Sequence, residues 1–266
     1  MVAPVSVKTL RDHRSGIAGW VAALVLLALM DLAVFPTVKS QAGQMEQFLK
    51  AYPEALKAMF GLGADFGTGP GYFDAEFLSF LGPLVVLAIG IGFGAGATAA
   101  EEERGTIDWL LSAPLSRTRV MLEKSLGVLL AVLTAGAALL VVLAIGSPAA
   151  GLDLGIGGIA AAVANLVLLG WAYGALALFA GAATGHRWAA TAVAVGLGLA
   201  GYLLTSLSRI VPALGSWRWL SPFTWYASRD ALAGHLHAGY LAAFLLTTLI
   251  GITLAVVAFR RRDLGT

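Results

Sequence analysis

The chain has 266 residues, of which 59% are hydrophobic and 12% are charged, and its formal net charge is +2. Soluble proteins carry about 25% charged residues, so this composition and a mean hydropathy of +0.84 exclude an ordinary soluble domain. The small net charge and the absence of a basic stripe argue against a nucleic-acid partner. Without any cysteine, the chain cannot form a disulfide or a cysteine-ligated metal site.

Apolar blocks recur along the sequence, each close to the roughly 20 residues that a helix needs to cross a bilayer. Because backbone polar groups must be satisfied inside the bilayer, we predict an all-α membrane protein with one transmembrane domain, residues 1–266. The first span has no A-x-A-like cleavage site, so we interpret it as retained rather than as a signal peptide. Asp31, near its end, is expected at a membrane interface. The six predicted spans are residues 17–35, 77–98, 120–145, 156–184, 189–206 and 238–259.

The distribution of lysine and arginine predicts the orientation. If the N-terminus is cytoplasmic, the cytoplasmic segments hold 11 of the 17 basic residues and the outer segments hold six. We therefore expect a multi-pass protein of the plasma membrane, surrounded by membrane lipid, with both termini in the cytoplasm.

Two outer segments follow from this orientation. Residues 36–76 form a long first outer loop, with a glycine-rich part at 61–73. Residues 208–240 are dense in tryptophan, tyrosine and proline, which predicts an aromatic belt and short helical pieces that begin at prolines. The outer-face residues singled out here are Trp217, Trp219, Pro222 and Trp225.

A charged stretch, "AAEEERGTIDWLLSAPLSRTRVMLEK" at 99–124, separates two apolar runs. At ~100° per residue, its acidic positions fall on one face of a helix and Ile107, Leu110 and Leu111 fall on the other. Pro114 ends that helix, and Ser116 is a candidate N-cap for the next span. We interpret residues 101–113 as a short amphipathic helix at the cytoplasmic surface that docks on a partner with a basic groove. The alternative is a solvated loop.

The same stretch resembles the loop between the second and third spans of ATP-binding-cassette type-2 exporter permeases. That family pattern runs acidic–acidic–x–x–Gly–Thr and then Leu-Leu-x-x-Pro-x-Ser-Arg. The resemblance continues in "YFDAEFLSFLGPLVVLAIGIGFGA" (72–95), "WLSPFTWY" (219–226) and "AFRRRDLGT" (258–266). It implies six transmembrane helices with a cytoplasmic coupling helix and short outer-face helices.

The resemblance also implies partners. Two permeases of this kind pair, and two separate ATPase subunits bind beneath them and contact the coupling helix. ATP and Mg²⁺ are then held by the partner ATPase, and we expect no cofactor and no enzymatic activity in this chain, which has no G-x-x-x-x-G-K-[ST] motif. The residues expected at the ATPase contact are Glu101, Glu102, Glu103, Arg104, Gly105, Thr106, Asp108, Arg117, His186 and Arg187.

Glycines four residues apart recur inside the apolar runs. "GIGFGA" at 90–95 matches a dinucleotide-binding pattern, but it lies inside a span and follows no strand. Close packing of helices explains these glycines better. We favour packing between helices of one chain over packing between two copies of the chain. The pairs are Gly90/Gly94, Gly92/Gly96, Gly170/Gly174 and Gly181/Gly185.

Other kinds of site find little support. The four histidines lie at or outside the span ends, and the G-x-S-x-G motif of a hydrolase is missing. "HLH" at 235–237 does not share a helix face, so we expect no metal site. Asn165, Trp171 and Tyr173 are candidates for a substrate pathway, or else they form hydrogen bonds between helices.

These observations predict the permease subunit of an ATP-driven exporter that works as a homodimer. Its substrate is expected to be hydrophobic or amphipathic: a drug, as in multidrug resistance, a peptide antibiotic, a lipid or an envelope precursor. Three alternatives remain at this point: a permease that serves metalloenzyme maturation, a membrane anchor for a cytoplasmic partner without transport, and a membrane-embedded enzyme.

Overall fold

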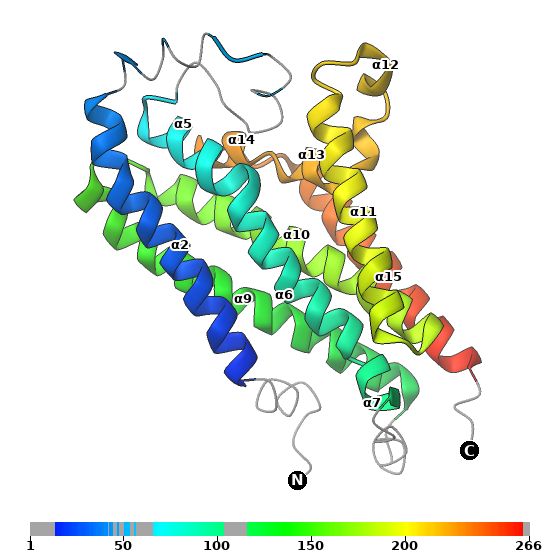
Figure 1. Ribbon diagram of the computed structural model, residues 1–266. Coiled ribbons are helices and arrows are strands. Elements are labelled where there is room, and N and C mark those ends of the chain that lie inside the picture. Colours follow the sequence, from blue (N-terminus) through cyan, green and yellow to red (C-terminus); the bar gives the residue numbers. More distant parts are fainter. Residues whose placement is uncertain are drawn as a thin grey trace.

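The computed structural model describes residues 14–41, 43, 44, 47, 51–53, 56, 66–103 and 116–262. Within these residues the regular structure is helical and contains no strand. Six helical segments are long and apolar enough to cross a membrane, and they overlap the six predicted spans in order. They are α2 (Arg14–Ser40), the continuous segment Gly69–Gly96, α9 (Arg117–Ala150), α10 (Ile156–Thr184), α11 (Arg187–Leu207) and α15 (Ala238–Arg261). The predicted six-helix fold class is confirmed (Figure 1).

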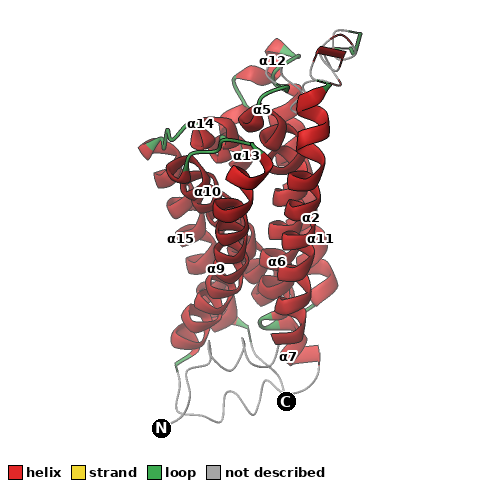
Figure 2. Ribbon diagram, turned by 90° about the vertical axis from the view of Figure 1, so that its left-hand side faces the viewer, coloured by secondary structure: helices red, strands yellow, loops and turns green. Residues whose placement is uncertain are grey.

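The bundle has two ends, which we name the base and the crown. The base holds the first residue of α2, the short α7 (Ala99–Glu103) and the last residue of α15 (Figures 1 and 2). The crown holds the short elements α5 (Gly69–Phe73), α12 (Pro212–Gly215), η2 (Arg218–Leu220), α13 (Pro222–Tyr226) and α14 (Ser228–Leu232). Prolines occupy the first turns of α12 and α13, because this position needs no intrahelical N–H donor.

Helix α10 is the centre of the bundle. In its most apolar window 72% of the residues are buried, against 22% in α15. Glycines bring α6 (Gly82–Gly96) against it: a Cβ on Gly90 or Gly94 would overlap the carbonyl of Gly170 or Gly174. Small residues let backbones approach closely in membrane helices, so the predicted intrachain packing is confirmed at this crossing.

The second span contains a π-helical stretch, η1 (Asp74–Leu81), between α5 and α6. The N–H of Gly82 donates to the carbonyl of Phe77, five residues back, instead of four. Pro83 follows, and its ring would collide with a carbonyl of the preceding turn in a regular α-helix. The wider turn removes that collision and keeps the segment continuous.

The predicted first outer loop is wrong at both ends. Helix α2 continues past residue 36 to Ser40. α5 begins at Gly69, inside the glycine-rich stretch, because the Thr68 hydroxyl accepts from the N–H of Gly71 and Pro70 stands in the first turn. Asp31 is also not near the end of its helix: it lies nine residues before Ser40 and is 4% exposed.

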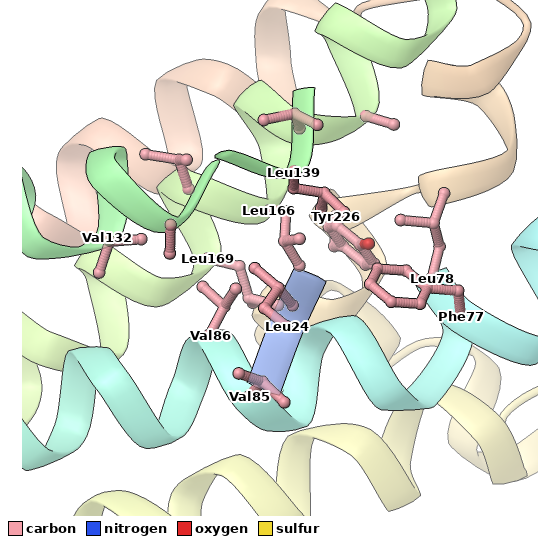
Figure 3. Packing of buried hydrophobic residues seen from close by; sticks show 14 of the residues in the cluster. Leu24, Phe77, Leu78, Val85, Val86, Val132, Leu139, Leu166, Leu169 and Tyr226 are labelled. Carbon is pink, nitrogen blue, oxygen red and sulfur yellow. The ribbon is translucent and has the colours of Figure 1, made fainter. Parts of the chain in front are cut away.

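Aromatic and branched side chains from α2, η1, α6, α9, α10 and α13 form one apolar core (Figure 3). Tyr226 of α13 inserts into this core from the crown, where burial and the nearby Asp74 carboxylate raise the pKa of its hydroxyl well above the usual value. Tyr226 therefore anchors α13 in the bundle.

Candidate functional site at the base

The predicted ATPase contact lies at the base, where the described chain ends at Glu103 and resumes at Ser116. Glu102 and Glu103 belong to α7, as does Glu101. The other predicted contact residues of this stretch, Arg104, Gly105, Thr106 and Asp108, lie outside the described residues. So does most of the predicted coupling helix at 101–113.

Glu102 forms a bidentate ion pair with Arg262, the residue that follows α15. The two oxygen–nitrogen distances are 2.6 and 3.0 Å. The Glu102 side chain is 25% exposed and that of Arg262 is 28% exposed, so the pair is mostly withdrawn from solvent. Two parallel charge-assisted bonds fix orientation as well as distance. Glu102 therefore fastens α7 to the end of α15.

Glu103 binds the start of α11. Its Oε1 accepts a hydrogen bond of 2.8 Å from the backbone N–H of Arg187, the first residue of that helix. The N-cap residue, His186, makes no side-chain capping bond to α11; its Nδ1 lies 2.8 Å from the Thr184 carbonyl oxygen. A carboxylate at a helix N-terminus satisfies an orphan donor and interacts favourably with the helix dipole. Glu103 thus replaces the missing cap.

Arg117, at the start of α9, binds the C-terminal end of α15. Its Nη1 donates to the carbonyls of Phe259 at 3.1 Å and Arg262 at 2.9 Å, and its guanidinium lies 5.8 Å from the centre of the Phe259 ring. The last carbonyls of a helix have no intrahelical partner, so a cation is stabilising there. Ser116 caps α9 through its hydroxyl, which accepts from the N–H of Arg119, as predicted.

Lys124 completes the connections at the base. It is 2% exposed, and its Nζ donates to the carbonyl of Ala97, the C-cap of α6. The base therefore joins α6 and α7 to three other long helices, α9, α11 and α15, through side chains rather than through apolar packing alone. Of the predicted contact residues, Glu102, Glu103, Arg117, His186 and Arg187 are all found in this one region.

Gly185 leaves space for the ion pair between Glu102 and Arg262. It ends α10 in the left-handed conformation, with φ 71°, and a Cβ there would lie 2.5 Å from Nη2 of Arg262 and 2.9 Å from Oε2 of Glu102. Glycine is the residue that adopts this backbone without strain. Sequence reasoning missed Arg262 as a site residue; its one signal is the run of three arginines at 260–262.

The predicted pathway residues form hydrogen bonds between elements. Asn165 Nδ2 donates to the carbonyl of Tyr226 at 3.0 Å, Trp171 Nε1 donates to the hydroxyl of Ser125 at 3.3 Å, and Tyr173 is 1% exposed. These contacts match the alternative interpretation, hydrogen bonding between helices. The three cavities described for this chain are lined by other residues.

The predicted outer-face residues gather at the crown. Trp217 and Trp219 are 57% and 49% exposed, and the indole N–H of Trp225 donates to the carbonyl of Trp219 at 3.0 Å. Pro222 is buried at the start of α13. Exposed tryptophans at one end of an apolar bundle suit a membrane–water interface.

No metal-binding group of three or more histidine, aspartate or glutamate side chains occurs among the described residues. A family model described as "ABC-2 family transporter protein" matches residues 4–264. The comparison with curated proteins gave no match.

Proposed function

The chain belongs to the ABC-2 transporter family, and from that premise we propose that it is the transmembrane permease subunit of an ATP-driven exporter. In this proposal it pairs with a second copy of itself and with two separate ATPase subunits. It moves a hydrophobic or amphipathic substrate out of the cytoplasm, the base faces the cytoplasm, and the membrane is the plasma membrane.

The observation that carries this proposal is the attachment of the acidic segment at the base. Glu102 and Glu103 tie α7 to α15 and α11, while Lys124 of α9 holds the last turn of α6. A force applied to the chain just after Glu103 would reach four of the six long helices through polar bonds. A segment that only faced water would need no such attachment.

The orientation and the substrate class have separate support. Arg117, Arg187 and Arg260–Arg262 all lie at the base, in keeping with the excess of basic residues on the cytoplasmic side of membrane proteins. In α10, Nδ2 of Asn165 donates to the Tyr226 carbonyl and the partly buried Trp171 donates to Ser125. Most side chains buried in the bundle are apolar, which suits an apolar or amphipathic substrate.

Purification with associated proteins tests the proposal. The full chain carries a tag after Thr266, is extracted in a mild detergent, and is analysed by mass spectrometry and by ATP hydrolysis. We expect a stoichiometric ATPase with a phosphate-binding loop. Asp108→Lys, at a predicted contact position, should reduce its capture, because a reversed charge opposes a basic groove. A Glu102→Arg, Arg262→Glu double variant keeps the internal ion pair and serves as the matched control.

Each contrary result favours another function. A monodisperse chain that captures no ATPase favours the membrane anchor. Catalytic activity of the purified chain alone favours the membrane-embedded enzyme.

A further inference from the structure

Two cavities with opposite chemistry meet near the crown. One is a groove of about 400 Å³ between α6 and α11, and the other is a polar cavity of about 310 Å³ at the crown. Both are lined by Ser79, Tyr202 and Phe223, so one continues into the other. We call the first the apolar groove and the second the crown cavity.

The apolar groove has the length of one membrane leaflet. Along α11 its lining extends from Thr191 to Tyr202. Eleven residues of α-helix rise about 16 Å, and half of a bilayer's hydrocarbon core is about 15 Å. Leu87 and Ile91 of α6 face the groove, and Gly92 and Gly198 widen it because they carry no side chain. Its shape and surface suit an extended acyl chain.

The crown cavity has more basic than acidic side chains in its lining. Three arginines and two aspartates line it. Asp74 accepts a hydrogen bond of 2.5 Å from Ser228, and Asp230 lies 3.1 Å from a ring nitrogen of His237. Arg209 and Arg218, in contrast, form no ion pair with any carboxylate in the described part of the chain.

The polar wall beside these arginines is fixed in place. The hydroxyl of Thr205 lies 2.8 Å from that of Ser221 and 3.1 Å from that of Thr224, and Thr224 donates to the carbonyl of Arg218 at 2.7 Å. The guanidinium of Arg218 also lies 5.1 Å from the centre of the Trp219 ring. These bonds hold α13 and η2 against the end of α11, so the backbone of Arg218 is fixed beside the crown cavity that continues into the groove.

We infer that this cleft is a binding site for a glycerophospholipid with an anionic headgroup, taken from the leaflet at the crown. One acyl chain occupies the apolar groove, and the phosphate lies at Arg209 and Arg218. A free anion would leave the groove unexplained. A second copy of the chain that covered the groove would leave the two exposed arginines at its crown end unexplained. The inference does not depend on the proposed transport function.

Native mass spectrometry of the full chain tests this site. The protein is delipidated in detergent and mixed with equal amounts of phosphatidylglycerol and phosphatidylcholine with identical chains, and the ratio of the two lipids retained is measured. We expect phosphatidylglycerol to be preferred. Arg209→Gln with Arg218→Gln should lower the ratio about thirtyfold, since each arginine near a membrane surface contributes on the order of 1 kcal/mol to anionic lipid binding and about 1.4 kcal/mol is tenfold. The control, Arg260→Gln with Arg261→Gln, removes the same charge at the base.

A second pair of variants tests the groove without removing a charge. Gly92→Leu with Gly198→Leu fills it from both sides, and a Cβ at either position meets no atom closer than 3.7 Å, so we expect the protein to fold. Retention of both lipids should fall. The control is Gly196→Leu on α11. A Cβ at Gly196 meets no atom within 4 Å, and Gly196 does not line the groove.

Three results would overturn the inference. The first is an unchanged lipid ratio in the arginine pair, and the second is an equal fall in its control, which would indicate net charge alone. The third is unchanged lipid retention in the Gly92→Leu, Gly198→Leu variant together with dissociation of its dimer. That result would assign the groove to a second copy of the chain.

Discussion

The ion pair between Glu102 and Arg262 joins residues 160 apart, and its contribution to stability can be measured directly. Exposed ion pairs contribute about 0–1 kcal/mol, and breaking a fully buried one costs about 3–5 kcal/mol. With two short bonds and side chains about one-quarter exposed, this pair lies between those limits. We expect a coupling free energy of about 1–2 kcal/mol.

A double-mutant cycle measures that coupling. Glu102→Gln, Arg262→Gln and the double variant are unfolded by heat in one detergent, beside the exchanged pair Glu102→Arg, Arg262→Glu. For a chain of this length 1 kcal/mol corresponds to about 2–4 °C, so each single variant should lower Tm by about 2–8 °C. The double variant should lose little more than either single variant, and the exchanged pair should recover most of the loss.

The exposed pair at the crown provides the control cycle. Lys39 and Asp153 are 3.7 Å apart, with side chains 53% and 83% exposed, so their coupling should be below about 0.5 kcal/mol. Two results would refute the reasoning: additive losses in the Glu102 and Arg262 variants, or an exchanged pair less stable than both single variants. Either would mean that the bidentate geometry does not persist in solution.

Three further predictions concern helix packing and caps. Gly94→Leu should abolish monodisperse protein in size-exclusion chromatography because its side chain would overlap a carbonyl of α10, whereas Gly92→Leu, with no atom within 4 Å, should preserve it. Arg117→Gln should lower the free energy of unfolding by about 1–2 kcal/mol, since carbonyls at the end of α15 lose a charged donor, and a thermal scan measures this. Asn165→Leu should cost about 1–2 kcal/mol in the same scan and leave transport per folded molecule unchanged; lost transport with unchanged stability would instead support the pathway prediction.

The sequence predicts this fold well where local chemistry decides. Six apolar runs give the six long helices, Ser116 caps α9, and the glycines at 90 and 94 pack against α10. Each of these features depends on residues within one or two turns of each other, or on a helix face that glycine spacing reveals. The prediction fails at residues 69–76, where a capping threonine and a proline extend a helix into a glycine-rich stretch.

The contacts at the base are less accessible to sequence reasoning. Glu102 meets Arg262 and Glu103 meets the N-terminus of α11 only because the C-terminal ends of α6 and α15 and the N-terminus of α11 lie together at the base. Charge patterning marks Glu102 and Glu103 as functional but cannot tell an internal partner from an external one. Arg262 looks like one of three equivalent basic residues until the fold selects it.

These internal contacts change where a docking interaction must be sought. Arg262 neutralises the charge of Glu102 within the chain, whereas Glu103 accepts one backbone N–H from Arg187 and keeps its negative charge. In the proposed complex, a basic groove on a partner would then be recognised by Glu103 and by residues that follow it, such as Asp108, rather than by Glu102. Variants of Glu102 should alter coupling through the position of α7, and the exchanged pair with Arg262 should restore it. If Asp108 contacts the partner as proposed, its variants should weaken docking directly, and no substitution of Arg262 should rescue them.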